Sequence, residues 1–332
     1  MKKRVVAYRK LPAAALRILE TQYDVTCADA DSQCDAFLAA LGDAHGTIGN
    51  KLKLTAELLD AAPKLEVVST VSAGYDDFDV ADLTRRGIVL CNTPVEVTET
   101  TADLMFALIL ATARRIAELD ASTRRGEWQG SSGPAQFGVD VHHKTLGIIG
   151  LGRIGAAVAR RAAHGFGMNV LYANRSRNVA AEEAFGAKWC PLPTLLAEAD
   201  FVCVLVPLST ATEKLIGAAE LRLMKSSAIL VNCARGQVVD EAALTDALRE
   251  GRILGAGLDV FEHEPLPADS PLCALPNVVL VPHIGSATAQ TREAMARRAA
   301  QNLAEALEGR LTSTCVNPSA VAARSVPHTP RD

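Results

Sequence analysis

Short apolar runs alternate with stretches of helical periodicity along the first third of the chain. The runs have the length of strands, and the stretches between them place apolar residues on one side of a helix. Strands that alternate with helices predict a parallel sheet covered by helices. The predicted strands are residues 4–8, 47–48, 65–70 and 88–90, and the predicted helices are residues 13–19, 35–41 and 56–61.

The middle of the chain begins with a long stretch that contains neither glycine nor proline. Residues 98–125 are rich in Ala, Leu and Met, with Thr98 suited to an N-cap and Gly126 to the end of a helix. We predict one long helix here. The sequence WQGSSGPAQFGVD, residues 128–140, has no periodicity and contains Gly, Ser and Pro, which predicts a loop or an arm.

Strands and helices alternate regularly from residue 146 onward, which predicts a doubly wound α/β unit. A last helix is predicted at residues 290–307. The polar, proline-containing sequence RSVPHTPRD, residues 324–332, is typical of a disordered tail. The predicted strands of this half are 146–149, 169–172, 201–206, 228–232, 255–258 and 278–281, and the helices between them include 154–163 and 241–250.

Composition and charge exclude several classes of protein. The 332 residues are 49% hydrophobic and 22% charged, which is typical of two globular domains. With 34 Lys and Arg against 38 Asp and Glu, the net charge of -4 gives no basic excess for nucleic acid. The apolar run at 104–113 is shorter than the ~20 residues that span a bilayer. The N-terminus lacks the apolar core of a secretion signal, so we expect a cytoplasmic protein.

The eight cysteines form no C-x-x-C pair. In a chain of this length they are typical of small core residues that stay reduced. We therefore expect no metal site.

A glycine-rich sequence, GLGRIG, joins the strand predicted at 146–149 to the helix that follows. Gly150 suits a tight turn, Gly152 lets the backbone approach a pyrophosphate, and Gly155 lets the helix pack closely on the strand. The pattern indicates a dinucleotide-binding site. A plain glycine turn between strand and helix is the alternative interpretation.

The end of the next predicted strand favours NADP(H) over NAD(H). An NAD site has an acidic residue about 20 residues after the glycine loop, but the segment YANRSR, residues 172–177, contains none. Arg175, Ser176 and Arg177 suit a 2′-phosphate, because guanidinium groups bind phosphate through paired hydrogen bonds. NADP(H) is therefore the preferred cofactor and NAD(H) the second candidate. A solvated loop would also explain the arginines.

Three polar residues follow the ends of predicted strands, where a doubly wound sheet binds ligands. Arg235 can clamp a carboxylate, and His283 can donate a proton to a carbonyl oxygen. Glu264 can accept a hydrogen bond from the imidazole and stabilise its charged form. Together the three would polarise a ketone. Taken singly, they could instead be an ion-pair arginine, a surface carboxylate and a core histidine.

Four motifs resemble the D-isomer-specific 2-hydroxyacid dehydrogenase family: GLGRIG, NCARGQVVDE, GLDVFEHEP and PHIGSAT. The resemblance extends over nearly the whole chain. Within the family, the sequences VSAGYDDFDV, DVHHKTLGIIGLGRIG and KSSAILVN are most similar to the bacterial glyoxylate/hydroxypyruvate reductases of the B type, also called 2-ketogluconate reductases.

The resemblance implies two flavodoxin- or Rossmann-like α/β domains with doubly wound parallel sheets, the cofactor domain being inserted into the substrate domain. The substrate domain would comprise residues 1–98 and 287–320. The cofactor domain would comprise residues 99–286, including a dimerisation helix and arm, and residues 321–332 would form a flexible tail. The family also implies a homodimer.

The resemblance further implies NADPH-preferring reduction of glyoxylate, hydroxypyruvate or 2-ketogluconate to a D-2-hydroxy acid. His283 would donate the proton with Glu264 as its partner. Arg235, with the backbone amides of Ala73 and Gly74, would bind the substrate in a cleft between the domains. The residues expected to contact the cofactor are Gly150, Gly152, Arg153, Ile154, Gly155, Asn174, Arg175, Ser176, Arg177, Asp259, His283 and Gly285.

Two alternative functions stay open: a dinucleotide-binding scaffold of the corepressor type, and an NAD-dependent dehydrogenase of another D-2-hydroxy acid. Formate dehydrogenases are disfavoured, because they pair the histidine with glutamine where this chain has Glu264. Phosphite dehydrogenases are disfavoured, because they have a lysine at the position of Ala73. The candidates for contact with the far end of the substrate are Asn50, Lys51 and the arm at 128–137.

Overall fold

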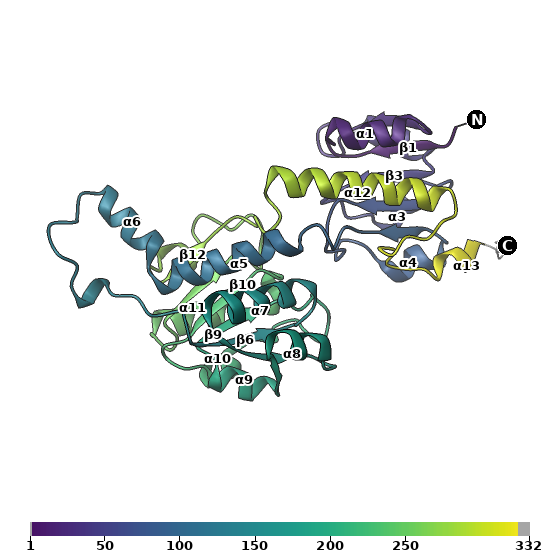
Figure 1. The fold of residues 1–332 in the computed structure, drawn as a ribbon. Helices are drawn as coiled ribbons and strands as arrows, with labels where there is room; N and C mark the ends of the chain where they lie inside the picture. The colour runs from purple at the N-terminus through teal and green to yellow at the C-terminus, as the bar shows by residue number, and fades with distance from the viewer. Residues whose placement is uncertain (1, 325–332) are drawn as a thin grey trace. The chain divides into compact units, whose positions relative to one another are not determined.

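The computed structural model describes residues 2–324 and divides the chain into two compact units (Figure 1). Unit 1 contains the residues up to Val97 and those from Ala287 onward, and unit 2 runs from Thr98 to Ser286. The sequence predicted domain boundaries after residues 98 and 286, and in the structure they lie after residues 97 and 286. Each unit has its own parallel sheet with helices on both faces, which is the predicted α/β class.

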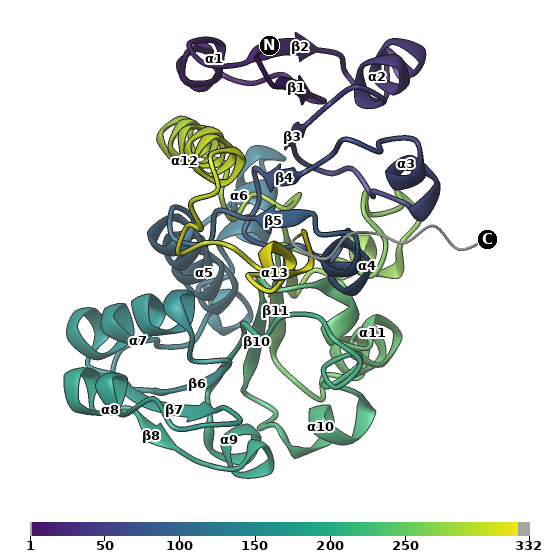
Figure 2. The same ribbon diagram turned by 90° about the vertical axis from the view of Figure 1, so that its right-hand side faces the viewer.

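Unit 1 is built on a five-stranded parallel sheet in the order β2-β1-β3-β4-β5. This is the flavodoxin-like order, in which the chain changes direction between β1 and β3. Helices α1 and α12 cover one face and α2, α3 and α4 the other (Figure 2). The strands are β1 Arg4–Ala7, β2 Asp24–Cys27, β3 Gly46–Gly49, β4 Val67–Thr70 and β5 Val89–Cys91, and the helices are α1 Ala13–Glu20, α2 Cys34–Leu41, α3 Ala56–Asp60, α4 Val80–Arg85, α12 Ala289–Leu307 and α13 Ala320–Arg324.

Unit 2 is built on a seven-stranded parallel sheet in the order β12-β11-β10-β9-β6-β7-β8. The chain starts in the middle, runs to the β8 edge and then returns to build the other half from β9. Its crossover point therefore lies between β6 and β9. Helices α5, α7 and α8 pack on one face, and α9, α10 and α11 on the other.

The elements of unit 2 include three short 3-10 helices. The strands are β6 Thr145–Ile149, β7 Asn169–Ala173, β8 Lys188–Trp189, β9 Phe201–Val204, β10 Ile229–Asn232, β11 Gly255–Leu258 and β12 Val278–Leu280, the helices are α5 Thr98–Ala113, α6 Ile116–Arg124, α7 Arg153–Phe166, α8 Val179–Phe185, α9 Leu192–Glu198, α10 Ala218–Leu223 and α11 Glu241–Arg249, and the 3-10 helices are η1 Pro134–Gln136, η2 Gly236–Val238 and η3 Pro271–Ala274.

Every predicted strand is present, but two edge strands were missed. β2 and β8 lie at sheet edges, and most of their residues are exposed. An edge strand that faces water needs no apolar pattern, so these segments carry little sequence signal. The short helices α4, α8, α9 and α10 were also missed for want of a long periodic stretch.

The single long helix predicted at 98–125 is wrong. The chain forms α5 and α6 instead, with Arg115 between them in the left-handed conformation at φ 55°. Such a conformation costs about 1–2 kcal/mol for a residue other than glycine, and here side-chain contacts stabilise it. The Arg115 guanidinium donates to Glu118 at 2.9 and 2.7 Å, and also to the Ala135 carbonyl of the arm.

The C-terminal segment is more ordered than the sequence suggests. The tail predicted at 321–332 begins inside α13, so its first four residues are helical. The rest of that tail, residues 325–332, lies outside the described residues. None of the helices within residues 2–324 has the length and hydrophobicity needed to cross a bilayer.

Candidate active site

The candidate catalytic and cofactor residues of unit 2 all follow the carboxyl ends of strands in one parallel sheet. The glycine loop follows β6, and Asn174 follows β7. Arg235 follows β10, Asp259 and Glu264 follow β11, and His283 follows β12. Since parallel strands end at the same edge, the topology brings these groups to one side of the sheet, beside the crossover point of β6 and β9.

His283 and Glu264 form a direct pair. Nδ1 of His283 lies 2.7 Å from Oε2 of Glu264, and the two side chains are 40% and 32% exposed. The other carboxylate oxygen, Oε1, accepts a hydrogen bond from the backbone N–H of Phe261 at 3.2 Å. The pair leaves Nε2 of the imidazole for a substrate. A histidine oriented in this way can donate a proton to a carbonyl oxygen.

Asp259 fixes the backbone around His283. His283 has the left-handed φ of 51°, and its N–H donates to the Asp259 carbonyl at 2.9 Å. The Asp259 carboxylate accepts hydrogen bonds from the N–H groups of Ile284 at 2.6 Å and Gly285 at 2.9 Å. Burial raises the pKa of Asp259, and these two donors oppose that rise. Asp259 therefore holds the backbone of the loop that carries His283 in place.

Arg235 sits in a turn that only a glycine at the next position permits. A Cβ at Gly236 would lie 1.8 Å from the carbonyl carbon of Phe261, so the turn packs directly on the backbone that leads to Glu264. Asn232 holds the turn through its amide, which donates to the Arg235 carbonyl at 3.0 Å, and its carbonyl oxygen accepts from the Ala234 N–H at 3.0 Å. The role of Asn232 was not predicted from the sequence.

The glycine loop has the shape that a phosphate requires. Gly150 adopts φ 102°, and a Cβ there would lie 2.8 Å from the backbone of Leu205 and Val206. A Cβ at Gly155 would lie 2.6 Å from the Gly150 carbonyl oxygen, whereas Gly152 has no neighbour within 4 Å of its Cβ position. Gly152 is also the N-cap of α7 and offers no side-chain cap. The first amides of α7 can therefore bind a dinucleotide pyrophosphate.

An arginine of the loop after β7 has a carboxylate partner in α8 that the sequence did not reveal. Arg177 donates to Glu182 of α8, with Nε 3.0 Å from Oε1, and the hydroxyl of Tyr172 donates to the same carboxylate. These donors lower the pKa of Glu182. Arg175 and Ser176, in contrast, are exposed and form no hydrogen bond or ion pair with residues 2–324. Of the two arginines, Arg175 is the free one.

Asn174 lies at the other end of that loop. Its Oδ1 accepts a hydrogen bond from the Leu151 N–H at 2.7 Å, which ties the end of β7 to the glycine loop. Asn174 therefore shapes the candidate cofactor site through the backbone.

Ala73 and Gly74 belong to unit 1, in the loop after β4. Their backbone N–H groups donate no hydrogen bond to any described residue of the chain. The amide of Asn92 donates to the Ala73 carbonyl at 2.7 Å, and Asn302 of α12 donates to the Asn92 carbonyl at 3.0 Å. The loop is thus held from its carbonyl side while its N–H groups stay available for an anion.

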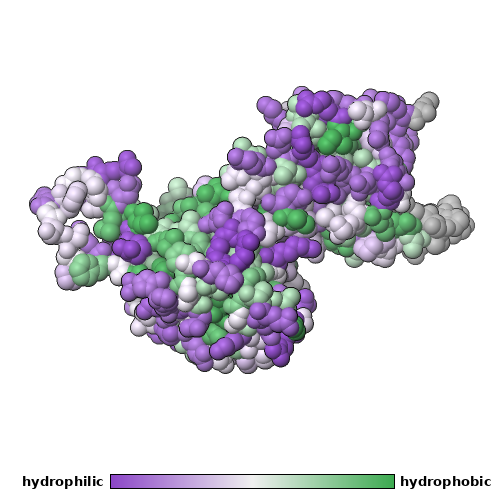
Figure 3. Space-filling view, in the orientation of Figure 1, coloured by the Kyte–Doolittle hydropathy of each residue, from purple (hydrophilic) through white to green (hydrophobic). Residues whose placement is uncertain are grey.

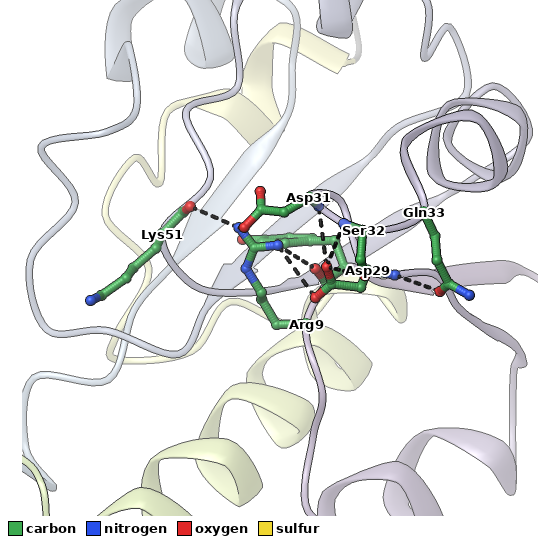
Figure 4. A network of polar contacts seen from close by, with 7 residues as sticks. Arg9, Asp29, Asp31, Ser32, Gln33 and Lys51 are labelled. Atoms are coloured by element: carbon green, nitrogen blue, oxygen red, sulfur yellow. Dashed lines mark hydrogen bonds and ion pairs between the residues drawn. The ribbon is translucent and has the colours of Figure 1, made fainter.

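Lys51 lies after β3 of unit 1, next to Asn50, and has the left-handed φ of 52°. Arg9 holds its backbone through a hydrogen bond from Nη2 to the Lys51 carbonyl at 3.3 Å (Figure 4). Arg9 is itself fixed by ion pairs with Asp31 at 2.8 Å and Asp29 at 3.4 Å. The Lys51 ammonium points away from this network.

Comparisons with a family model and with curated relatives identify the family of the chain. Residues 106–285 match the family model described as the NAD binding domain of D-isomer specific 2-hydroxyacid dehydrogenases. A glyoxylate/hydroxypyruvate reductase B of Yersinia enterocolitica is 53% identical over 321 residues, 96% of this chain and 98% of that protein. One of Escherichia fergusonii is 51% identical over 320 residues, 96% and 99% of the two chains.

The fold is also similar to that of a solved enzyme. The NADPH-dependent glyoxylate/hydroxypyruvate reductase of Sinorhizobium meliloti, solved with NADP and malonate, has a TM-score of 0.85 and 34% identity. The match covers 96% of this chain and 98% of that one.

Proposed function

Because the chain belongs to the D-isomer specific 2-hydroxyacid dehydrogenase family, we propose that it reduces small 2-oxo acids to D-2-hydroxy acids with NADPH as the preferred reductant. The chain is an NAD(P)-dependent oxidoreductase. The observation that carries the proposal is the 2.7 Å contact between His283 and Glu264 at the carboxyl ends of the sheet that also bears the glycine loop.

A nicotinamide cofactor held at the glycine loop and the first amides of α7 would supply a hydride for C2 of the 2-oxo acid. His283 donates a proton from Nε2 to the carbonyl oxygen as negative charge develops there. Glu264 stabilises the imidazolium before the transfer and keeps the ring oriented through Nδ1 after it. The chain thus contributes the proton and its position.

Substrate binding is assigned to cationic and backbone groups. Arg235 binds the carboxylate and polarises the carbonyl, since a guanidinium forms two charge-assisted hydrogen bonds with a carboxylate. The N–H groups of Ala73 and Gly74 bind the same carboxylate, which is supported by their lack of other acceptors among the described residues. Glyoxylate and hydroxypyruvate are the first candidates, because the named relatives are reductases of these acids. For 2-ketogluconate, Lys51 is the candidate contact for the end of the substrate that lies farthest from C2.

The proposal is tested by steady-state rates of the purified protein with NADPH and NADH, each with glyoxylate, hydroxypyruvate and 2-ketogluconate. We expect turnover with at least one acid, a D-configured product from hydroxypyruvate, and a higher kcat/KM with NADPH. Turnover that favours NADH would contradict the cofactor assignment alone. Absence of turnover with every pair would contradict the enzymatic proposal and favour a dinucleotide-binding scaffold.

We propose that Arg175 selects NADPH through the 2′-phosphate, with Ser176 as a second donor. Changing Arg175 to Asp should lower kcat/KM with NADPH by about 10- to 100-fold, because a charge-assisted contact of about 1.5–3 kcal/mol is replaced by repulsion. The kcat/KM with NADH should change by less than about threefold.

The matched control is Arg222→Asp, which makes the same charge change at an exposed position of α10. This control should leave kcat/KM unchanged with both NADPH and NADH. Equal losses with NADPH and NADH in the Arg175 variant would contradict the assignment.

We also propose a homodimer that uses α6 and the arm. Ile116, Trp128 and Phe137 are 53%, 67% and 62% exposed, although all three are large and apolar. Figure 3 shows hydrophobic residues on the surface around α6. Phe137 also lines a groove of about 210 Å³, together with residues of α5, α6 and the segment that leads into β12. Large exposed apolar side chains on one helix and its neighbouring arm are typical of a protein interface.

Changing Ile116 to Arg should weaken the dimer at least tenfold, because a charge would enter a desolvated apolar contact. Sedimentation velocity over a concentration series would measure the effect. Leu223→Arg is the matched control, since Leu223 is 45% exposed on α10. A monomeric wild type, or an equal effect of both substitutions, would contradict the interface.

The cytoplasmic location stays a prediction of the sequence.

A further inference from the structure

The C-terminal segment of unit 1 pairs with the edge strand β5 and places two cysteines opposite each other. Cys91, the last residue of β5, forms an isolated antiparallel bridge with Cys315. The flanking hydrogen bonds run from the Val316 N–H to the Leu90 carbonyl at 2.8 Å and from the Asn92 N–H to the Thr314 carbonyl at 3.2 Å. The cysteines therefore occupy the position of an antiparallel ladder at which the paired residues do not bond each other's backbone.

This position has the geometry of a disulfide. Directly opposed residues of this kind have Cα atoms about 4.5 Å apart, and their side chains lie closer than at the hydrogen-bonded positions. A disulfide accepts Cα separations of about 4.4–6.8 Å. Both cysteines are free, and the antiparallel bridge places them directly opposite each other. A disulfide thus requires little movement of the backbone.

The two thiols differ in a way that suits stepwise oxidation. Cys315 is half-buried, and the neighbouring Cys91 thiol lowers its pKa. Cys91 is buried, and the neighbouring Cys315 thiol together with burial raises its pKa. The thiolate is the reactive form of cysteine. Cys315 is therefore the thiol that meets an oxidant, and Cys91 is the thiol that completes the bond.

We propose that Cys91 and Cys315 form a reversible disulfide when the protein meets a low-molecular-weight disulfide such as oxidised glutathione. The Cys315 thiolate attacks one glutathione sulfur, the glutathione S–S bond breaks, and one glutathione thiolate leaves. Cys91 then loses its proton to solvent and attacks the Cys315 sulfur, which releases the second glutathione. The two cysteines are oxidised by two electrons, and one glutathione disulfide is reduced to two thiols.

The disulfide would lock the C-terminal segment to the sheet edge. Asn317 already fixes this segment, because its Oδ1 accepts from the Leu90 N–H at 2.7 Å and its amide donates to the Ile88 carbonyl at 2.9 Å. Asn92, the residue after Cys91, holds the Ala73 carbonyl. The bond would thus stabilise the end of β5, beside the loop that we assign to the substrate carboxylate. The disulfide itself does not depend on that assignment.

The test is oxidation of the whole reduced protein with excess oxidised glutathione, followed by alkylation of the remaining thiols and non-reducing peptide mapping. We expect one disulfide-linked pair of peptides, containing Cys91 and Cys315, that dithiothreitol removes. Cys273→Ser, a change at an exposed cysteine of unit 2, is the matched control and should form the same pair. Full alkylation of both cysteines after oxidation, or a different pair as the main product, would overturn the proposal.

A second measurement separates a specific thiol pair from general oxidation. In Cys91→Ser, Cys315 should stop at a mixed disulfide with glutathione, because no thiol is left to displace it. In Cys315→Ser, neither the linked pair nor a glutathione adduct on Cys91 should form, since Cys91 is buried. Glutathione bound at Cys91 in that variant would contradict the assigned order of attack. Melting temperatures of the two variants, taken with those of the reduced wild type, verify that both are folded.

Discussion

Replacing His283 with alanine should lower kcat for the reduction of a 2-oxo acid by about 10²- to 10⁴-fold, the usual contribution of a positioned proton donor. The variant loses the imidazole whose Nδ1 lies 2.7 Å from Oε2 of Glu264. Cofactor affinity, measured by quenching of protein fluorescence or by calorimetry, should change by less than about threefold. The loss would then be one of transition-state stabilisation.

His263→Ala is the matched control, because His263 is exposed beside Glu264 and has no polar partner among the described residues. Its kcat should stay close to that of the wild type. Glu264→Gln should fall between the two, since an amide keeps a hydrogen-bond acceptor at Nδ1 but does not stabilise the imidazolium. A His283→Ala variant that keeps more than about a third of the wild-type kcat would remove the proton-donor role.

Replacing Arg235 with methionine should lower kcat/KM by about 10²- to 10³-fold. Methionine keeps much of the side-chain length but removes the charge and the paired donors, and each charge-assisted hydrogen bond contributes about 1.5–3 kcal/mol. Arg235→Lys keeps the charge without the fork, so we expect an intermediate loss. The measurement is kcat and KM for hydroxypyruvate and glyoxylate at saturating NADPH.

The control for this substitution is Arg249→Met, at the exposed end of α11 where the arginine pairs only with Asp246 at 2.8 Å among the described residues. It should leave kcat/KM within about twofold. Circular dichroism and NADPH affinity of Arg235→Met should match the wild type, because Asn232 and Gly236 hold the turn in addition to the hydrogen bond from Arg235 Nη1 to the Ala234 carbonyl at 2.7 Å. Unchanged kcat/KM in Arg235→Met would exclude Arg235 from substrate binding.

The α/β class and most strands were predictable from the pattern of apolar residues, because buried parallel strands are continuous apolar runs and their helices have a regular period. The sequence also predicted that Arg235, Glu264 and His283 follow strands. Strands of a parallel sheet end at one edge, so their position along the chain implied their proximity in space. In the structure His283 contacts Glu264, and the turn at Gly236 packs on the backbone of Phe261.

Features without a local signal were not predicted. The break between α5 and α6 lies at an arginine, and the left-handed conformation of Arg115 depends on partners in α6 and the arm. The edge strands β2 and β8 face water and lack an apolar pattern. The flexible tail was predicted to begin at residue 321, but α13 extends to Arg324. This helix is too short to give a periodic pattern, and its first residue, Ala320, is buried against the rest of unit 1.

Which polar groups are already paired could be seen only in the folded chain. Glu182 reaches Arg177 from the next helix, so the two arginines that the sequence treated alike differ in their freedom to bind phosphate. Asn92 holds the loop of Ala73, and Cys315 lies opposite Cys91 although most of the chain separates them. Helix and strand patterns are local, so they can be predicted from neighbouring residues. The pairing of Arg177 depends instead on how the chain turns into α8, and the pairings of Asn92 and Cys315 depend on packing between segments far apart in the chain.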